Sequence, residues 1–305
     1  MERWHRMKRT LIDRFLDYMR LARSASENTL RSYRPVLEAF QGSLQGTAIQ
    51  EATPREIRAF LGQLLDAGND RITLRHRGSV LRSFYRWAWQ EGIVSDNPAN
   101  RLRLQAHTHK VPCVPSVQDA ERLIEAPPLD NWTGARDRAI FETLYSGGLR
   151  VAELVALDMD DVDFDRFVVH IRSGKGDKSR YTPIGPRAAK AIREYRAMLP
   201  TKRIPKGLKA VFLSASDRSL CPSKRITTRS IRRAFVEYAK RAGLTPEATP
   251  HTLRHCCGTH MLNRGANVRV VQTQLGHVSI ASTERYLHLT PQDLSKGHRA
   301  YHPRA

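Results

Sequence analysis

The segment Tyr145-Ser-Gly-Gly-Leu-Arg150-Val-Ala-Glu153-Leu154 predicts a junction between two helices. Two adjacent glycines are typical of a helix C-terminus, and Arg150 stands where the next helix begins. Glu153 follows three positions later, so it shares a helix face with Arg150 and can orient its guanidinium. A guanidinium held in this way can bind a phosphate through two parallel hydrogen bonds. A surface ion pair is the alternative interpretation of this segment.

A β-hairpin is predicted next along the chain. The strands are Phe167-Val-Val-His-Ile171 and Arg180-Tyr-Thr-Pro-Ile184, and the turn Ser173-Gly-Lys-Gly-Asp-Lys178 lies between them. Lys175 lies at the tip between two glycines, which let the loop approach another molecule closely. It is either a solvated turn residue or a group that reaches into a DNA groove and acts there as a general acid.

A capped helix is predicted for Thr249-Pro-His-Thr-Leu-Arg-His-Cys-Cys-Gly-Thr-His-Met261, with His251 and Arg254 three residues apart on one face. A zinc site is the alternative, because the segment contains His251, His255, Cys256, Cys257 and His260. That alternative is disfavoured because the glutamate of a His-Glu-x-x-His site is missing. The two cysteines also point to different helix faces, and Arg254 would repel a divalent cation. We therefore expect no metal.

A possible nucleophile follows in Gln274-Leu-Gly-His277-Val-Ser-Ile-Ala-Ser-Thr-Glu-Arg-Tyr286-Leu-His-Leu289, where a helix stopped by glycine precedes His277. A tyrosine in an apolar stretch such as this one is ordinarily a core residue. A phenol is also a poor nucleophile at neutral pH unless positive charges and a base stabilise the phenolate. The arginines, lysine and histidines of the four segments are groups of that kind.

The first part of the chain, residues 1 to about 104, is predicted to be helical, because apolar residues recur there at spacings of three and four. One helix begins at Thr53-Pro-Arg-Glu56, a capping box with proline at the first helical position. Another, from about Thr73 to Gln90, has an apolar face and a second face that carries Arg75, Ser79, Arg82 and Arg86. This second face is either a DNA-contacting stripe or a solvated surface.

The chain therefore divides into a helical domain at 1–104, a linker at 105–115 and a second domain at 116–305. The linker is polar and interrupted by proline, and Ser116 then caps a new helix.

The composition predicts a polyanionic partner. The 305 residues include 51 Lys and Arg against 30 Asp and Glu, a net charge of +21, and a large arginine excess favours bidentate contact with phosphates. The four cysteines, Cys113, Cys221, Cys256 and Cys257, form no disulfide-like framework. With no charged leader and no long apolar run, we expect a cytoplasmic protein and no membrane contact.

The residues Arg150, Lys175, His251, Arg254, His277 and Tyr286, in this order and in these segments, resemble the tyrosine recombinase (phage integrase) family. Within it, the chain is most similar to the Xer group that includes XerC and XerD. The resemblance covers nearly the whole chain, including the ending His302-Pro-Arg-Ala305. It implies a mainly α fold with a small β-hairpin, in which a helical core-binding, SAM-like domain precedes the catalytic domain. Cys256 and Cys257 are the departure, since relatives have small residues without a thiol there, and they raise the question of oxidation sensitivity.

The resemblance also implies the chemistry. Tyr286 is the nucleophile that forms a 3′-phosphotyrosyl link, with His251 as general base and Lys175 as general acid. The scissile phosphate is held by Arg150, Arg254 and His277. The reaction exchanges one phosphodiester for another, so neither ATP, a metal nor any other cofactor is expected.

The partners implied are double-stranded DNA recombination sites, on which protomers assemble as a homo- or hetero-tetramer. A second Xer-type recombinase and a septal DNA translocase are further expected partners, in the resolution of chromosome or plasmid dimers during chromosome segregation and cell division. Three alternatives remain at this point: a phage, transposon or plasmid integrase of the same family, a non-catalytic sequence-specific DNA-binding protein, and a type IB topoisomerase.

Overall fold

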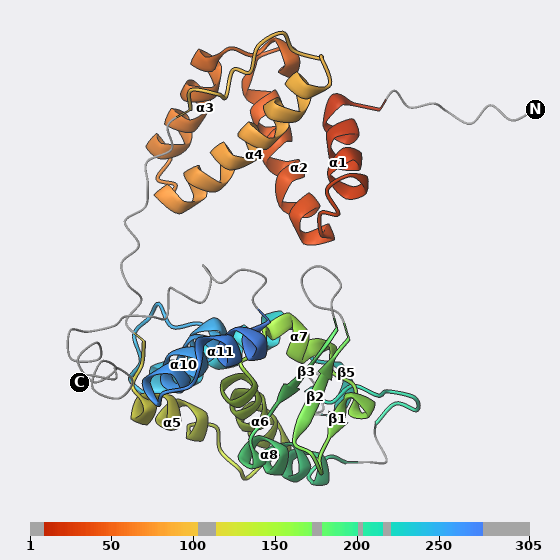
Figure 1. Cartoon of the computed structure of the whole chain (residues 1–305), viewed down its shortest axis with the longest axis vertical. Coiled ribbons are helices and arrows are strands. Elements are labelled where there is room, and N and C mark those ends of the chain that lie inside the picture. Colours follow the sequence, from red (N-terminus) through yellow and green to blue (C-terminus); the bar gives the residue numbers. More distant parts are fainter. Residues whose placement is uncertain (1–8, 103–113, 173–178, 201–203, 216–220, 277–305) are drawn as a thin grey trace, which may run out of the picture. The chain divides into compact units, whose positions relative to one another are not determined.

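The computed structural model describes residues 9–102, 114–172, 179–200, 204–215 and 221–276 (Figure 1). The chain forms two compact units, Met1–Val111 and Pro112–Ala305. The division between them falls within the stretch 105–115 that the sequence assigns to a linker. No helix among the described residues is long and apolar enough to span a membrane.

The described part of the first unit is helical. Its elements are α1 (Leu11–Leu21), α2 (Glu27–Ser43), η1 (Ile49–Glu51), α3 (Pro54–Asp66) and α4 (Arg71–Gln90). The capping box predicted at the start of α3 is present, since the Glu56 carboxylate accepts the backbone N–H of Thr53 at 2.7 Å. The core of the unit is aromatic, with Phe15, Phe40 and Phe84 fully buried and their rings in contact with neighbouring rings.

The second unit combines helices with two small antiparallel sheets. Its helical elements are α5 (Val117–Glu125), α6 (Trp132–Gly147), α7 (Val151–Ala156), η2 (Met159–Asp161), α8 (Pro186–Ala197), α9 (Thr228–Arg241), α10 (Pro250–Asn263) and α11 (Val268–Leu275). Its strands are β1 (Val162–Asp163), β2 (Val168–Ile171), β3 (Arg180–Pro183), β4 (Leu213–Ala215) and β5 (Pro222–Arg225).

The predicted hairpin is confirmed as β2 and β3. Val168 pairs with Pro183 and Ile171 with Arg180, so the described pairing ends at Ile171 and Arg180. β1 extends this sheet on the other side of β2, and β4 pairs with β5 in a second sheet. The sequence does not predict β1, β4 and β5, because these strands are too short to show an alternating pattern.

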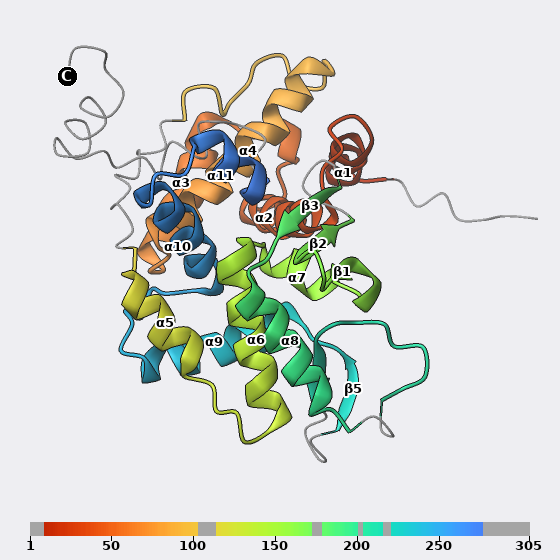
Figure 2. The same ribbon diagram turned by 60° about the horizontal axis from the view of Figure 1, so that its bottom comes forward.

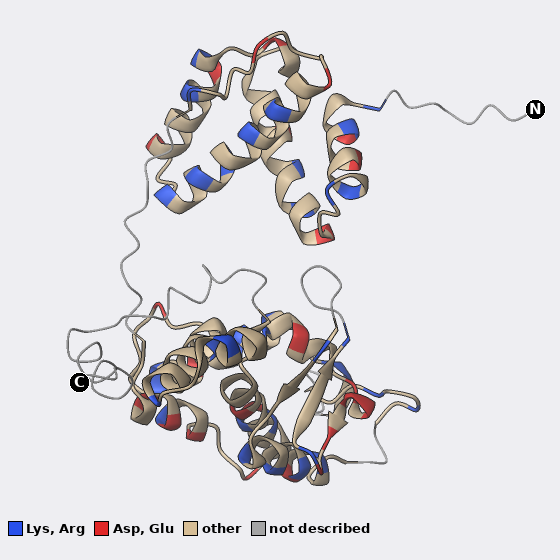
Figure 3. Ribbon diagram, in the orientation of Figure 1, with Lys and Arg blue, Asp and Glu red and all other residues tan. Residues whose placement is uncertain are grey.

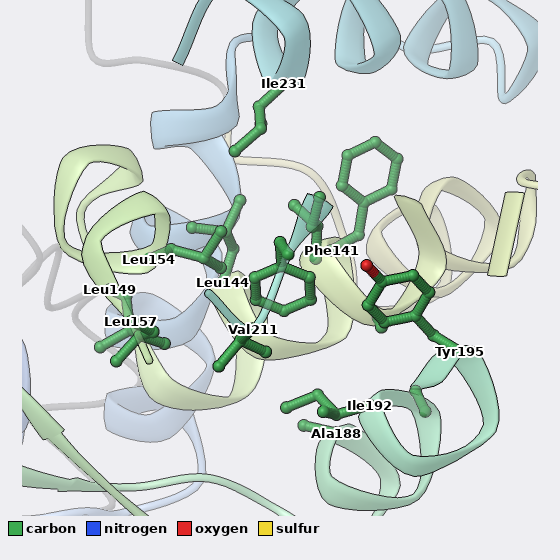
Figure 4. Packing of buried hydrophobic residues seen from close by; sticks show 14 of the residues in the cluster. Phe141, Leu144, Leu149, Leu154, Leu157, Ala188, Ile192, Tyr195, Val211 and Ile231 are labelled. Carbon is green, nitrogen blue, oxygen red and sulfur yellow. The ribbon is translucent and has the colours of Figure 1, made fainter. Parts of the chain in front are cut away.

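Helix α6 forms the centre of the second unit. It packs against α8 on one side and α10 on another (Figure 2). Its side chains Phe141 and Leu144 lie among apolar residues of α7, α8, α9 and the segment leading to β4, including Leu154, Ile192 and Val211 (Figure 4). Because α6 is held on so many sides, the junction at its C-terminus is fixed relative to α10. The mainly α fold with small sheets is confirmed.

Candidate active site

The junction after α6 is built by a glycine in the left-handed conformation. Gly148 has φ +60° and ends α6, and Arg150 is the N-cap residue of α7. A Cβ atom at Gly148 would lie 2.5 Å from Cδ2 of Leu275 and 3.1 Å from Sγ of Cys257. Both the backbone conformation and the close approach of α11 therefore require glycine here.

Arg150 is bound twice by the carboxylate of Glu153. Its Nη1 donates to Oε1 at 2.7 Å, and its backbone N–H donates to Oε2 at 2.8 Å. The Glu153 side chain is 5% exposed, whereas that of Arg150 is 31% exposed. The buried carboxylate thus fixes the guanidinium of Arg150, part of which remains exposed to solvent.

A second arginine, Arg180, binds the same carboxylate in a bidentate manner. Its Nη1 donates to Oε1 of Glu153 at 3.0 Å and its Nη2 to Oε2 at 2.8 Å. The sequence predicts Arg180 only as the first residue of a strand. An arginine next to the Lys175 turn was the available signal, but nothing in the sequence pairs it with Glu153.

Two arginines control the ionisation of Glu153. Burial opposes its negative charge, but the hydrogen bonds from Arg180 and Arg150 outweigh burial and lower its pKa below the ordinary value. Glu153 is therefore ionised at neutral pH.

Arg254 lies on α10 and is 1% exposed. Its Nη1 donates to the carbonyl oxygen of Gly148 at 2.6 Å, and its Nη2 donates to that of Leu275 at 2.5 Å. Arg150 in turn donates through Nη2 to the carbonyl oxygen of Gly276 at 3.3 Å. Two arginines that are 104 positions apart thus bind successive carbonyls at the end of α11, directly before His277.

His251 and Arg254 differ in exposure although they lie three residues apart on α10. His251 is exposed in the first turn of the helix, with its ring centroid 6.4 Å from that of His255. Lys175, His277 and Tyr286 lie outside the described residues. The structure therefore brings Arg150, Glu153 and Arg254 together. The catalytic roles of His251, Lys175, His277 and Tyr286 stay predictions.

The stripe predicted on α4 is mostly exposed. Arg75, Ser79 and Arg86 are exposed, and basic residues recur along this helix (Figure 3). Arg82 is half-buried and donates to the carbonyl oxygen of Leu102. Its position therefore serves the fold of the first unit in addition to any role toward DNA.

The residues of the alternative zinc site make contacts that do not involve a shared metal position. Cys256 and Cys257 are buried, which raises the pKa of each thiol to about 12. His260 lies between the Tyr145 hydroxyl and the Pro115 carbonyl oxygen, with each contact at 2.9 Å. Among the described residues, no group of three or more His, Cys, Asp or Glu is placed to hold a metal ion.

The arrangement favours an anionic ligand whose oxygens can accept paired hydrogen bonds from guanidiniums. The guanidiniums of Arg150, Arg180 and Arg254 carry three positive charges, and Glu153 carries one negative charge, so two positive charges remain uncompensated within this cluster. A phosphodiester is a ligand of that kind, and fixed guanidiniums also stabilise charge that develops on phosphoryl oxygens during displacement.

Comparison with known proteins supports this interpretation. Residues 116–293 match the phage integrase family, and residues 12–92 match the N-terminal SAM-like domain of phage integrases. The chain is 35% identical over 294 residues to the tyrosine recombinase XerC of Thermodesulfovibrio yellowstonii, which covers 96% of each chain. It is 32% identical to the tyrosine recombinase XerD of Staphylococcus haemolyticus over 97% of this chain and 99% of the other.

Solved structures give the same fold. The crystal structure of XerA recombinase aligns over 97% of this chain and 99% of the other, with 26% identity and a TM-score of 0.52. The Tn1549 transposon integrase in complex with a circular intermediate DNA aligns over 96% of this chain and 99% of the other, with 17% identity and a TM-score of 0.73.

Proposed function

The chain belongs to the phage integrase family of tyrosine recombinases, and on that premise we propose that it is a Xer-type site-specific recombinase that resolves DNA dimers. It cleaves and rejoins DNA through a 3′-phosphotyrosyl intermediate. The observation that carries the proposal is the convergence of Arg150 and Arg254 on the successive carbonyls of Leu275 and Gly276. These two carbonyls lie at the end of α11, and His277 is the next residue in the sequence.

The arginines bind the scissile phosphate in this proposal. Arg150, oriented by Glu153, offers its exposed edge to the non-bridging oxygens. Arg254 supplies a second guanidinium, and His277 a further hydrogen bond. Because hydrogen bonds hold the two guanidiniums before the reaction, these groups stabilise the transition-state charge without a reorganisation cost.

The bond changes use residues of the same domain. Tyr286 attacks phosphorus, and His251 accepts the phenolic proton. The bond to the 5′ oxygen breaks, and Lys175 donates a proton to that leaving group. Attack by a 5′-hydroxyl on the phosphotyrosine reverses the step on a new strand. One phosphodiester replaces another, so the exchange needs no external energy source.

The partners are part of the proposal. Strand exchange between two duplexes requires two protomers on each recombination site and four in the assembly. The similarity to both XerC and XerD relatives favours a second Xer-type recombinase as the other protomer. A septal DNA translocase would then time the reaction with chromosome segregation at cell division.

Trapping of the covalent intermediate tests the proposed function. The protein is incubated with nicked genomic fragments, denatured, and the attached DNA is sequenced, after which a nicked duplex is made from the mapped site. We expect a denaturant-resistant adduct with the wild type and none with Tyr286→Phe. Tyr181→Phe is the matched control, because Tyr181 is a 72% exposed tyrosine of β3, and this variant should form the adduct.

Two results contradict the proposal. An adduct that persists in Tyr286→Phe would reject the nucleophile. A wild-type protein that binds its mapped site tightly in a nicked duplex yet never becomes attached would be a non-catalytic DNA-binding protein.

A further inference from the structure

Arg180 is a half-buried arginine for which the proposed chemistry gives no role. It is the first residue of β3 and pairs with Ile171, the last residue of β2. It therefore lies at the base of the hairpin whose turn carries Lys175 in the sequence. Its side chain is 15% exposed, whereas arginine side chains are mostly exposed to solvent.

The contacts of Arg180 complete the coordination of Glu153. Each carboxylate oxygen of Glu153 accepts one hydrogen bond from Arg180 and one from Arg150. The carboxylate is thus fixed by four donors in two pairs. Without Arg180, Glu153 would keep only the backbone N–H and Nη1 of Arg150 as donors, and the position of that Nη1 would be less constrained.

Close packing holds Arg180 itself in place. A Cβ atom at Gly276 would lie 2.8 Å from both Cζ and Nε of Arg180, so the guanidinium lies directly against this glycine. Gly276 has φ +62° and ends α11. The orientation of the Arg180 guanidinium is therefore determined both by Glu153 and by Gly276. The carbonyl oxygen of Gly276 also accepts the hydrogen bond from Arg150.

We propose that Arg180 is a positioning residue for strand cleavage, which acts through Glu153 to aim the guanidinium of Arg150 at the scissile phosphate. Both terminal nitrogens of Arg180 donate to Glu153, so the proposal assigns it to that carboxylate. The inference rests on the proposed function, because the aim of Arg150 matters only if a phosphate is bound there. Misplacement of a catalytic group by about 1 Å costs on the order of 100-fold in rate.

The test separates DNA binding from the chemical step. Using the full chain and the nicked duplex from the mapped site, we would measure the DNA dissociation constant and the single-turnover rate of adduct formation at saturating DNA. For Arg180→Gln we expect the saturated rate to fall about 100-fold while the dissociation constant changes by less than about threefold. Arg180→Lys restores the charge but not the bidentate geometry, so it should recover part of the rate.

The matched control is Arg136→Gln. Arg136 is an 11% exposed arginine of α6 that also binds a buried carboxylate, that of Asp137 at 2.7 Å, and no described hydrogen bond joins it to Glu153. It controls for the loss of a buried ion pair, and its saturated rate should stay within about threefold of the wild type. Urea unfolding of each variant identifies the folded fraction used in the rates.

A double-mutant cycle tests the route through Glu153. If Arg180 acts by holding that carboxylate, Arg180→Gln should add less than about threefold to the loss already caused by Glu153→Gln. Full multiplication of the two losses would overturn the proposal, as would an Arg180→Gln protein that forms the adduct at the wild-type rate. A larger dissociation constant with an unchanged saturated rate would indicate that Arg180 contacts DNA directly. That result would also overturn the proposal. If the wild type forms no adduct, the proposed function fails and this inference fails with it.

Discussion

Nη1 of Arg254 lies 2.6 Å from the carbonyl oxygen of Gly148, so a side chain of α10 fixes the last turn of α6. The same guanidinium binds the carbonyl of Leu275 in α11. An arginine that the proposal assigns to the phosphate therefore also joins three helices. Its two roles have to be separated in any mutational test.

Arg254→Ala should lower the free energy of unfolding by about 2–4 kcal/mol, because two buried carbonyls lose their donor and a cavity remains. Urea unfolding at neutral pH measures the change. Arg232→Ala, which removes an exposed arginine of α9, should stay within about 0.5 kcal/mol of the wild type. Equal stability of wild type and Arg254→Ala would show that the carbonyl contacts contribute nothing. Loss of cleavage in Arg254→Ala is informative only for the folded fraction.

Gly148→Ala should destabilise the protein by about 2–4 kcal/mol, since strain at positive φ adds to the clash with Leu275 and Cys257. Gly207→Ala is the matched control. Gly207 has φ +80° and nothing within 4 Å of a Cβ atom, so the strain alone should cost about 1–2 kcal/mol. Thermal or urea unfolding compares the two. Equal losses of unfolding free energy in the two variants would mean that the α6–α7 junction accommodates a methyl group without a steric penalty.

Replacement of Arg75 or Arg86 by Ala should reduce the salt dependence of DNA binding. Each lost phosphate contact lowers the slope of log K against log salt concentration by roughly 0.9. Fluorescence anisotropy over a range of salt concentrations gives the slope. Arg58→Ala, which removes an exposed arginine of α3, should leave it unchanged. If Arg75 and Arg86 behave like Arg58, the stripe is a solvated surface.

Local sequence patterns were sufficient to predict most of the fold. The capping box at Thr53, the helix that begins after Ser116 and the hairpin around Lys175 all depend on residues close together in the chain. Short strands such as β4 owe their pairing to tertiary contacts, and a sequence pattern does not show these.

The candidate site was predictable only in part, for a similar reason. The Arg150–Glu153 pair follows from helical spacing. The contact of Arg180 with Glu153 joins residues 27 positions apart, and the burial of Arg254 depends on how α6, α10 and α11 pack. The roles of Lys175, His277 and Tyr286 stay predictions that depend on the family resemblance.

Cys256 and Cys257 should react slowly with iodoacetamide in the folded protein. Burial raises the pKa of both thiols to about 12, so the reactive thiolate is scarce at pH 7. Cys221 is partly exposed and should be labelled before Cys256 and Cys257. Mass spectrometry of peptides after timed labelling measures the three rates. Rapid labelling of Cys256 or Cys257 without unfolding would instead support oxidation sensitivity.

Acidification should weaken the contact that His260 makes between α6 and the start of α5. The Pro115 carbonyl can only accept, so Nε2 of His260 carries the proton and Nδ1 accepts from the Tyr145 hydroxyl. Burial lowers the pKa of His260 below its ordinary value of 6.5. The unfolded chain therefore binds a proton near pH 6.5 that the folded chain does not yet bind.

It follows that the contribution of His260 to the free energy of unfolding is present above about pH 6.5 and declines as the pH falls below it. The slope of the unfolding free energy against pH cannot exceed about 1.4 kcal/mol per pH unit for one proton. Urea unfolding of the wild type and of His260→Asn at pH 7.5, 6.5 and 5.5 isolates this residue from the other histidines. We expect the stability difference between wild type and variant to shrink toward pH 5.5. A difference that grows on acidification would mean that protonated His260 is the favoured form in the folded protein.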